Sequence, residues 1–215
     1  MRKRGTEAAV IASALLLAGC GGAETEPRGG RTAGSNSAAA VAPAAAPARA
    51  APASGAVLTA EGFGPLRIGM SRAQVVEALG DDSDPEAVGG PEPESCDEWR
   101  PARAPEGMLV MIEEGRLTRI SLIDESTVKT DRGLGLGAGA AAVRSVYGPA
   151  LRAEPHKYEE APAEYLVVWA KGAPRDDRSE VPVTSRGIVY EVGGKGAVQG
   201  IRAGGPSIQY VEGCA

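Results

Sequence analysis

The chain has 215 residues, of which 43% are hydrophobic and only 4% aromatic, and its 23 Lys and Arg residues are outnumbered by 28 Asp and Glu residues. An acidic chain without a basic patch argues against nucleic acid as a partner and against electrostatic docking to a membrane.

The first twenty residues have the composition of a bacterial export signal. The basic residues 2–4 precede an apolar run at 8–17 that is interrupted only by Ser13. A membrane-spanning helix needs about 20 apolar residues, so this run is too short for a permanent transmembrane anchor. We therefore interpret 1–19 as a signal peptide.

Residues 17–20, with the sequence Leu-Ala-Gly-Cys, resemble the lipobox of bacterial lipoproteins. In that family the signal peptidase cuts before the cysteine, which carries a diacylglycerol and usually an N-acyl chain. The resemblance implies that Cys20 is the lipid attachment site and that its acyl chains hold the protein on a membrane. Gly21 follows, where inner-membrane lipoproteins of enteric bacteria typically have Asp, which implies the outer membrane, facing the periplasm. An ordinary secretory signal with a chance cysteine is the alternative.

The segment that follows the cysteine is rich in Ala, Pro, Gly and polar residues and has almost no large apolar side chain. Such a segment cannot bury enough surface to offset the entropy lost on ordering. We interpret 20–55 as a tether, and a flexible chain of this length spans about 30 to 35 Å on average. The remaining 56–215 is long enough for one domain or two small fused halves.

Two segments of this region, 68–80 and 136–148, align without gaps. Each begins with an apolar residue followed by Gly, continues with the pattern of a short amphipathic helix and ends at a glycine. Ser71 and Gln74 predict a capping box for the first helix, whereas Gly139 is a weaker N-cap for the second. The predicted buried residues are Val75, Val76 and Leu79 in the first helix and Val143, Val146 and Tyr147 in the second.

Each predicted helix is followed by strand-like sequence. In the first half, strand-like segments at 108–112 and 117–123 flank a Glu-Glu-Gly-Arg turn, which predicts a hairpin. In the second half the predicted strands are 165–169, 188–192, 198–203 and a final strand at 207–211. The polar stretch between the first two of these, 171–187, is the expected exposed loop.

These patterns predict an α+β fold made of two tandem repeats, 56–127 and 128–215. Each repeat would consist of a short helix and an antiparallel sheet, and the helices would cover one side of the sheet.

Cys96 and Cys214 are the cysteines that remain after Cys20 is assigned to lipid attachment. In an oxidising compartment they are expected to form a disulfide, which would stabilise the fold by about 4 to 5 kcal/mol in the chain-entropy model. A reactive thiol or redox pair is the less favoured alternative, because no Cys-x-x-Cys spacing is present.

Residues with catalytic or ligand-binding chemistry are scarce. His156 lies in a turn-like context without a second histidine, so we expect a solvated loop side chain. The acidic run 81–86 fails the calcium-loop pattern, and the glycines of 133–139 match the dinucleotide fingerprint only loosely. The sequence therefore predicts no catalytic residue, no metal site, no nucleotide and no other cofactor.

Aromatic residues are better candidates for binding another protein. Trp99, Tyr165, Trp169 and Tyr190 fall in or beside predicted strands. The favoured interpretation is that these side chains pack inside the sheet. If alternate aromatic side chains faced outward instead, they would form a binding face, because Tyr and Trp are typical interface anchors. Together with Arg178 in the predicted loop, they are the candidate partner-binding residues.

The doubled unit resembles the tandem-repeat fold of β-lactamase inhibitory protein, and a single unit is similar to SmpA/OmlA-type outer-membrane lipoproteins. The likeness rests on 66–71 with 79–80, and on 134–139 with 147–148. These motifs belong to the backbone at the two ends of each helix, so no contact residue is carried over. The lipobox, and one candidate disulfide instead of two, depart from the inhibitor. The resemblance implies the fold and a tendency to bind proteins.

The sequence thus favours a lipid-anchored, non-catalytic protein-binding module that contacts a protein of the cell envelope. Two alternatives remain open. One is an inhibitor or sensor of an envelope hydrolase of the lysozyme or β-lactamase type, and the other is an envelope enzyme, which would need a convergent polar pocket.

Overall fold

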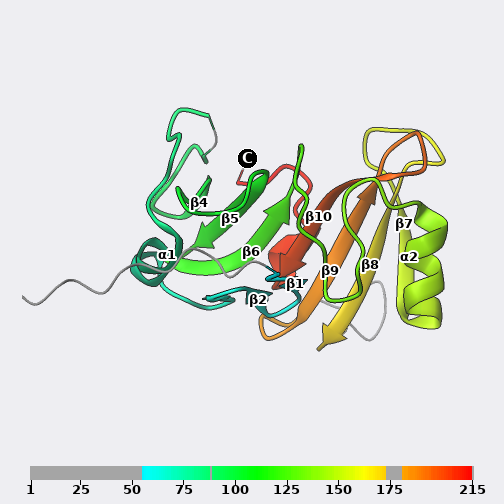
Figure 1. The fold of residues 1–215 in the computed structure, drawn as a ribbon, viewed down its shortest axis with the longest axis horizontal. Helices are drawn as coiled ribbons and strands as arrows, with labels where there is room; N and C mark the ends of the chain where they lie inside the picture. Colours follow the sequence, from blue (N-terminus) through cyan, green and yellow to red (C-terminus); the bar gives the residue numbers. More distant parts are fainter. Residues whose placement is uncertain (1–54, 88, 173–180, 215) are drawn as a thin grey trace, which may run out of the picture. The chain divides into compact units, whose positions relative to one another are not determined.

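The computed structural model describes residues 55–87, 89–172 and 181–214, and its fold is of the predicted α+β type (Figure 1). The predicted signal peptide, Cys20, Arg178 and all but the end of the predicted tether lie outside these ranges. Among the described residues, no helix is both long enough and apolar enough to span a membrane. In chain order the elements are β1 (Leu58–Thr59), β2 (Gly62–Phe63), β3 (Leu66–Arg67), α1 (Arg72–Leu79), β4 (Cys96–Trp99), β5 (Met108–Glu113), β6 (Arg116–Leu122), α2 (Ala140–Tyr147), η1 (Gly148–Ala150), β7 (Leu151–Pro155), β8 (Glu164–Lys171), β9 (Arg186–Val192), β10 (Val198–Gly204) and η2 (Pro206–Gln209).

Both predicted helices form between the expected ends. At the start of α1, the Ser71 hydroxyl accepts the N–H of Gln74, and the Gln74 side chain accepts the N–H of Ser71, which completes the predicted capping box. Gly139 precedes α2 without any side-chain cap. The helices end at Gly80 and Gly148, which have φ values of 94° and 52° that favour glycine.

Seven antiparallel strands form the main sheet, in the order β4-β5-β6-β10-β9-β8-β7. The predicted hairpin is β5 and β6, and the predicted strands of the second half are β8, β9 and β10. In each half a helix precedes strands that run from an outer edge of the sheet to its centre, where β6 and β10 pair. This arrangement has the layout of two repeats, although the duplication itself stays a prediction.

Three features of the sheet differ from the sequence-based expectation. The predicted final strand is wrong, because Pro206 starts a short 3-10 helix and Ile208 is buried against the sheet without pairing in it. Neither edge strand, β4 nor β7, was predicted, since only Trp99 in β4 and Leu151 in β7 are large apolar residues. The small three-stranded sheet β1-β2-β3 was missed because its strands have two residues each.

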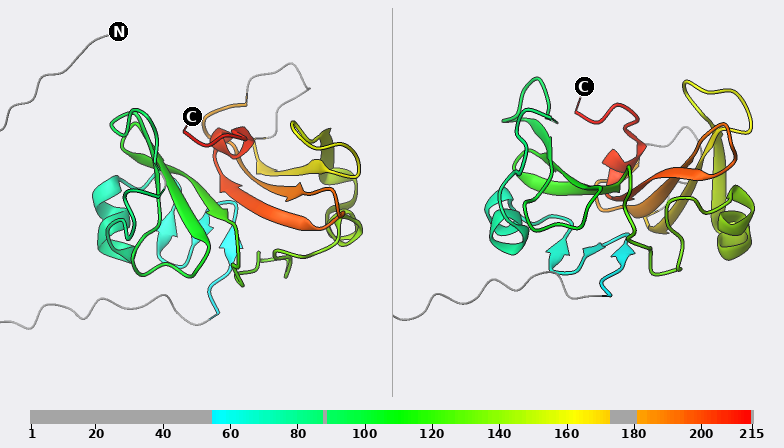
Figure 2. Two further views of the ribbon diagram at one scale, coloured as in Figure 1. Left: turned by 90° about the horizontal axis from the view of Figure 1, so that it is seen from above. Right: turned by 45° about the horizontal axis from the view of Figure 1, so that its top comes forward.

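The two faces of the main sheet are covered by different parts of the chain. One face forms the larger hydrophobic core with α1, α2 and the sheet β1-β2-β3. The opposite face carries the C-terminal segment (205–214), and Figure 2 shows this segment and β1-β2-β3 on opposite sides of the sheet. The predicted disulfide between Cys96 and Cys214 is present and joins the end of this segment to β4.

Charged side chains hold the C-terminal segment on the sheet. Arg119 is paired with Glu98 at 2.6 Å, and its guanidinium also donates to the main-chain carbonyls of Ser207 and Tyr210. Because both charges of the pair are almost fully buried, each one depends on the other for compensation. The segment is therefore fixed by a buried ion pair as well as by the disulfide.

Candidate functional site

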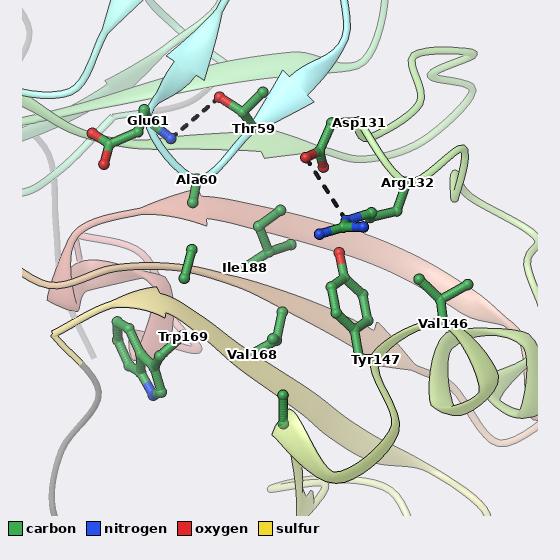
Figure 3. Close-up of a pocket in the computed structure, with 12 residues that line it drawn as sticks. Thr59, Ala60, Glu61, Asp131, Arg132, Val146, Tyr147, Val168, Trp169 and Ile188 are labelled. Carbon is green, nitrogen blue, oxygen red and sulfur yellow. Dashed lines mark hydrogen bonds and ion pairs between the residues drawn. The ribbon is translucent and has the colours of Figure 1, made fainter.

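A cleft of about 450 Å³ lies between the turn at Thr59–Glu61, helix α2 and strands β8 and β9 (Figure 3). It is on the helix-covered side of the sheet. The residues that line it are Thr59, Ala60, Glu61, Asp131, Arg132, Val146, Tyr147, Ala150, Val168, Trp169, Ala170 and Ile188. Five separate segments of the chain contribute to this lining, so only the tertiary structure brings them together.

The floor and one wall of the cleft are apolar. Val168, Ile188 and Ala60 are buried beneath it and belong to the main core. Val146 of α2 borders the cleft with 44% of its surface exposed, which corrects the expectation that it is buried with Val143. The helix packs on the sheet through Val143, and Val146 is left facing the hollow that the cleft occupies.

A chain of hydroxyl groups leads from the cleft into the core. The hydroxyls of Tyr147 and Tyr190 are 2.8 Å apart, and Tyr190 donates to the Thr130 hydroxyl at 3.3 Å. Burial raises the pKa of both tyrosines above the ordinary value of tyrosine. The two hydroxyls therefore stay protonated and give the cleft a neutral polar wall.

Charges of both signs form the rim. Asp131 and Arg132 are 4.0 Å apart and largely exposed, and Glu61 lies 3.5 Å from the guanidinium of Arg186. Of these residues, Glu61, Asp131 and Arg132 line the cleft and Arg186 does not, so the lining carries two carboxylates and one guanidinium. The apolar floor and hydrogen bonds supply the remaining selectivity.

The main chain of β8 borders the cleft beyond the point where the pairing of β8 with β7 ends. On one side β9 pairs with β8 as far as Lys171, but on the other side β7 begins only at Leu151, opposite Val168. Residues Trp169–Lys171 therefore have no strand partner on the β7 side within the described chain. The 3-10 turn at Gly148–Ala150 comes directly before β7.

Three of the candidate partner-binding residues are buried, which agrees with the favoured interpretation of packing inside the sheet and not with the alternative of an exposed aromatic face. Trp99 and Tyr190 are fully buried on the core side of the sheet, and Tyr165 is 5% exposed on the other side. Successive strand residues point to opposite faces, and both faces of this sheet are covered. The aromatic side chains are thus divided between two packed layers.

Trp169 is half-buried, and its side chain points away from the cleft. A Cβ atom placed on Gly187 would lie 2.7 Å from the Trp169 ring and 3.0 Å from Ile208, so the indole covers Gly187 on the face with the C-terminal segment. Figure 3 shows the indole apart from Val168 and Ile188. Arg178 lies outside the described residues.

His156 is buried by its side chain, which corrects the expectation of a solvated loop residue. The side chain is 4% exposed and stacks on the Tyr165 ring at 4.7 Å. Its Nδ1 accepts the N–H groups of Tyr158 and Glu159, and its Nε2 lies 3.4 Å from Glu191. The residue therefore organises the turn after β7. Sequence reasoning missed this because Tyr165 and Glu191 come from other strands.

Sequence reasoning also missed most of the cleft. The sequence singles out Val146 and Tyr147 as helix residues expected to be buried and Trp169 as a candidate partner-binding residue, whereas the rim residues Asp131 and Arg132 carry no signal. In the ranges that the structure describes, no three His, Cys, Asp or Glu side chains are grouped to hold a metal ion. No protein family model, no curated protein and no solved structure matches the chain.

Proposed function

We propose that the chain is a lipid-anchored protein of the bacterial cell envelope, which binds another envelope protein through the cleft without turning it over. The observation that carries this proposal is an open hollow with an apolar floor, bordered by the exposed side chain of Val146 and by unpaired main chain of β8. Exposed apolar surface of this kind, with a polar rim, is typical of interaction sites.

The polar groups of the cleft support binding more than catalysis. Acyl or phosphoryl transfer needs a nucleophile and a base within hydrogen-bond reach of each other. Among the residues that line the cleft, the Thr59 hydroxyl donates to the Gly62 carbonyl and the Tyr147 hydroxyl is held by Tyr190. These groups are engaged in holding the walls together.

The N-terminal segments would place the cleft in the envelope. In this proposal the lipid on Cys20 fixes the protein on the outer membrane, and the tether at 20–55 lets the folded part reach about 30 to 35 Å from the headgroups. Thr59–Glu61, which line the cleft, follow this tether closely in sequence.

Photocrosslinking in cells tests the proposal. A photoreactive amino acid is placed at Ala150 or Ala170, which are exposed at the cleft, and at the exposed residue Glu94 as a control. We expect a discrete protein adduct from the two cleft positions and none from Glu94. Mass spectrometry of the adduct identifies the partner. Equal adducts from all three positions, or none at the cleft with normal expression, would refute the proposal.

A pair of matched variants sharpens the test. Val146→Asp puts a charge at the cleft, and Val57→Asp makes the same change at a residue outside the lining with similar exposure, 42% against 44%. A loss of about 1.4 kcal/mol in binding corresponds to a tenfold loss of affinity, and we expect at least that for V146D. V57D should crosslink like the unaltered protein. Equal behaviour of the two variants would place the binding site elsewhere.

A further inference from the structure

We propose that the partner enters the cleft as an extended strand that pairs with the main chain of β8 at Trp169–Lys171. This inference rests on the proposed function and specifies the kind of segment that is bound. It combines two independent observations, the open strand edge and the apolar hollow beside it.

Strand β8 continues past the end of β7, with a register irregularity between Trp169 and Lys171. β9 holds Trp169 and Lys171 in the ladder through their pairing with Gly187 and Arg186. On the other side, Ala170 and Lys171 are exposed and no strand pairs with them in the described chain. Unpaired N–H and C=O groups at such an edge form a template for an added strand.

The outer edges of the sheet are less suited to strand addition. β7 has only five residues, and its exposed part carries Glu154 and ends in Pro155, which lacks an N–H. β4 is tied by Cys96 to the C-terminal segment. Charge, proline and short length are the usual protection of an edge strand. At Trp169–Lys171 the edge adjoins an apolar hollow.

The hollow specifies which side chains the added strand should carry. Strand side chains alternate between the two faces of a sheet, so every second residue of a strand beside β8 would point to the face of Val168 and Ile188. Those positions should be apolar, because the floor is apolar. The intermediate positions point to the opposite face, where Trp169 is only half-buried, and can be polar. The expected ligand is therefore a short extended segment with alternating apolar and polar residues.

Peptides with altered main chains test this mode of binding. The probes are capped heptapeptides in which Thr alternates with Val, Leu or Phe, added to the full purified chain. For the best binder, two isomers are made that carry N-methyl groups on alternate residues, one on the odd and one on the even positions. Alternate N–H groups of a strand point in opposite directions, so only one isomer loses hydrogen bonds to β8. We expect at least a tenfold loss for that isomer and little change for the other.

Amide hydrogen exchange identifies the stretch that pairs. We expect the bound peptide to slow exchange at Trp169–Lys171, and V146D to abolish this protection while V57D retains it. Equal binding of both isomers, or protection confined to another part of the chain, would overturn strand pairing. Slow exchange without peptide at an amide of this stretch that points away from β9 would also overturn it, because the edge would then be occupied by the chain itself.

The two proposals can fail separately. If crosslinking from Ala150 and Ala170 captures a partner but no heptapeptide binds and exchange at Trp169–Lys171 stays unchanged with that partner, the function stands and strand pairing fails. If neither partner nor peptide is found at the cleft, the proposed function fails together with the inference.

Discussion

Helices α1 and α2 occupy corresponding places in the two halves of the fold, but they pack differently. Each has eight residues and precedes strands that run from an edge of the sheet to its centre. α1 buries Val75 and Leu79, whereas α2 buries only Val143. The sheet of the first half supplies Trp99, which is fully buried in the core with α1 and lies under the guanidinium of Arg72 at 4.2 Å.

The second half also places a large, fully buried side chain beside its helix, Tyr190, whose ring centroid lies 5.8 Å from that of Tyr147. Tyr147 itself is only half-buried, and Val146 remains exposed at the cleft. Each helix therefore covers its half of the sheet, but among the described residues of the second half no large side chain fills the space over Val168 and Ile188. The difference indicates that the cleft is the space that this missing side chain leaves.

The largest expected effect comes from removing the Trp99 side chain. Trp99→Ala should lower the free energy of unfolding by about 3 to 5 kcal/mol, because the cavity left under α1 cannot collapse fully. Val146→Ala, beside the existing cleft, should change it by less than about 0.5 kcal/mol. Urea denaturation measures both. Equal losses would contradict the view that the space beside Val146 is unfilled.

Alkaline pH should lower the free energy of unfolding through the tyrosines of the second half. All five tyrosines lie after residue 128, and burial raises the pKa of Tyr190, Tyr147 and Tyr165. Tyrosine in the unfolded chain titrates near pH 10, below the raised pKa values of the folded protein. The stabilisation is therefore fully present below about pH 10. As the pH rises toward those raised pKa values, the free energy of unfolding falls by on the order of 1 kcal/mol per pH unit for one tyrosine.

Urea denaturation at pH 9, 10 and 11 measures this loss. Tyr190→Phe should reduce the slope with pH, although it is also destabilised at neutral pH because Tyr147 and Thr130 lose their partner. A slope that is unchanged in this variant would mean that Tyr190 does not carry the effect.

Local pattern predicted most of the secondary structure. The capping box at Ser71 and the glycines that end both helices are signals within one turn of chain, and all were confirmed. The strands β5, β6, β8, β9 and β10 were predicted because each is rich in apolar and β-branched residues, in continuous runs or in alternation with polar ones. The disulfide was predicted from two cysteines, without knowledge of their distance.

The faces of the strands and the cleft could not be predicted in the same way. Alternation shows that Tyr165 and Trp169 share a face, but it does not show that the C-terminal segment covers that face. That segment was itself predicted as a strand. The cleft is an unfilled space between five segments, and a missing side chain leaves no pattern in a sequence. Val146 matches a buried helix stripe, and only the structure shows the hollow beside it.

The smallest expected effects separate a weak helix from an unfilled core as the cause of the cleft. Ser71→Ala removes the cap of α1 and should cost about 1 kcal/mol. Gly139→Ser adds the missing cap to α2 and should stabilise by about 0.5 kcal/mol. Gly139 has an extended backbone, with φ of −70°, and a Cβ there would meet no atom within 4 Å, so the change introduces no strain.

Because Gly139→Ser acts only at the start of α2, it makes the two helices alike in their caps without filling the cleft. If the cleft exists for lack of a large side chain, binding of the heptapeptides should be unchanged in this variant while its free energy of unfolding rises. If the cleft exists because α2 is poorly anchored, the capped helix should close over Val168 and Ile188 and weaken binding. The stability and the affinity, measured on the same protein, therefore decide between the two causes.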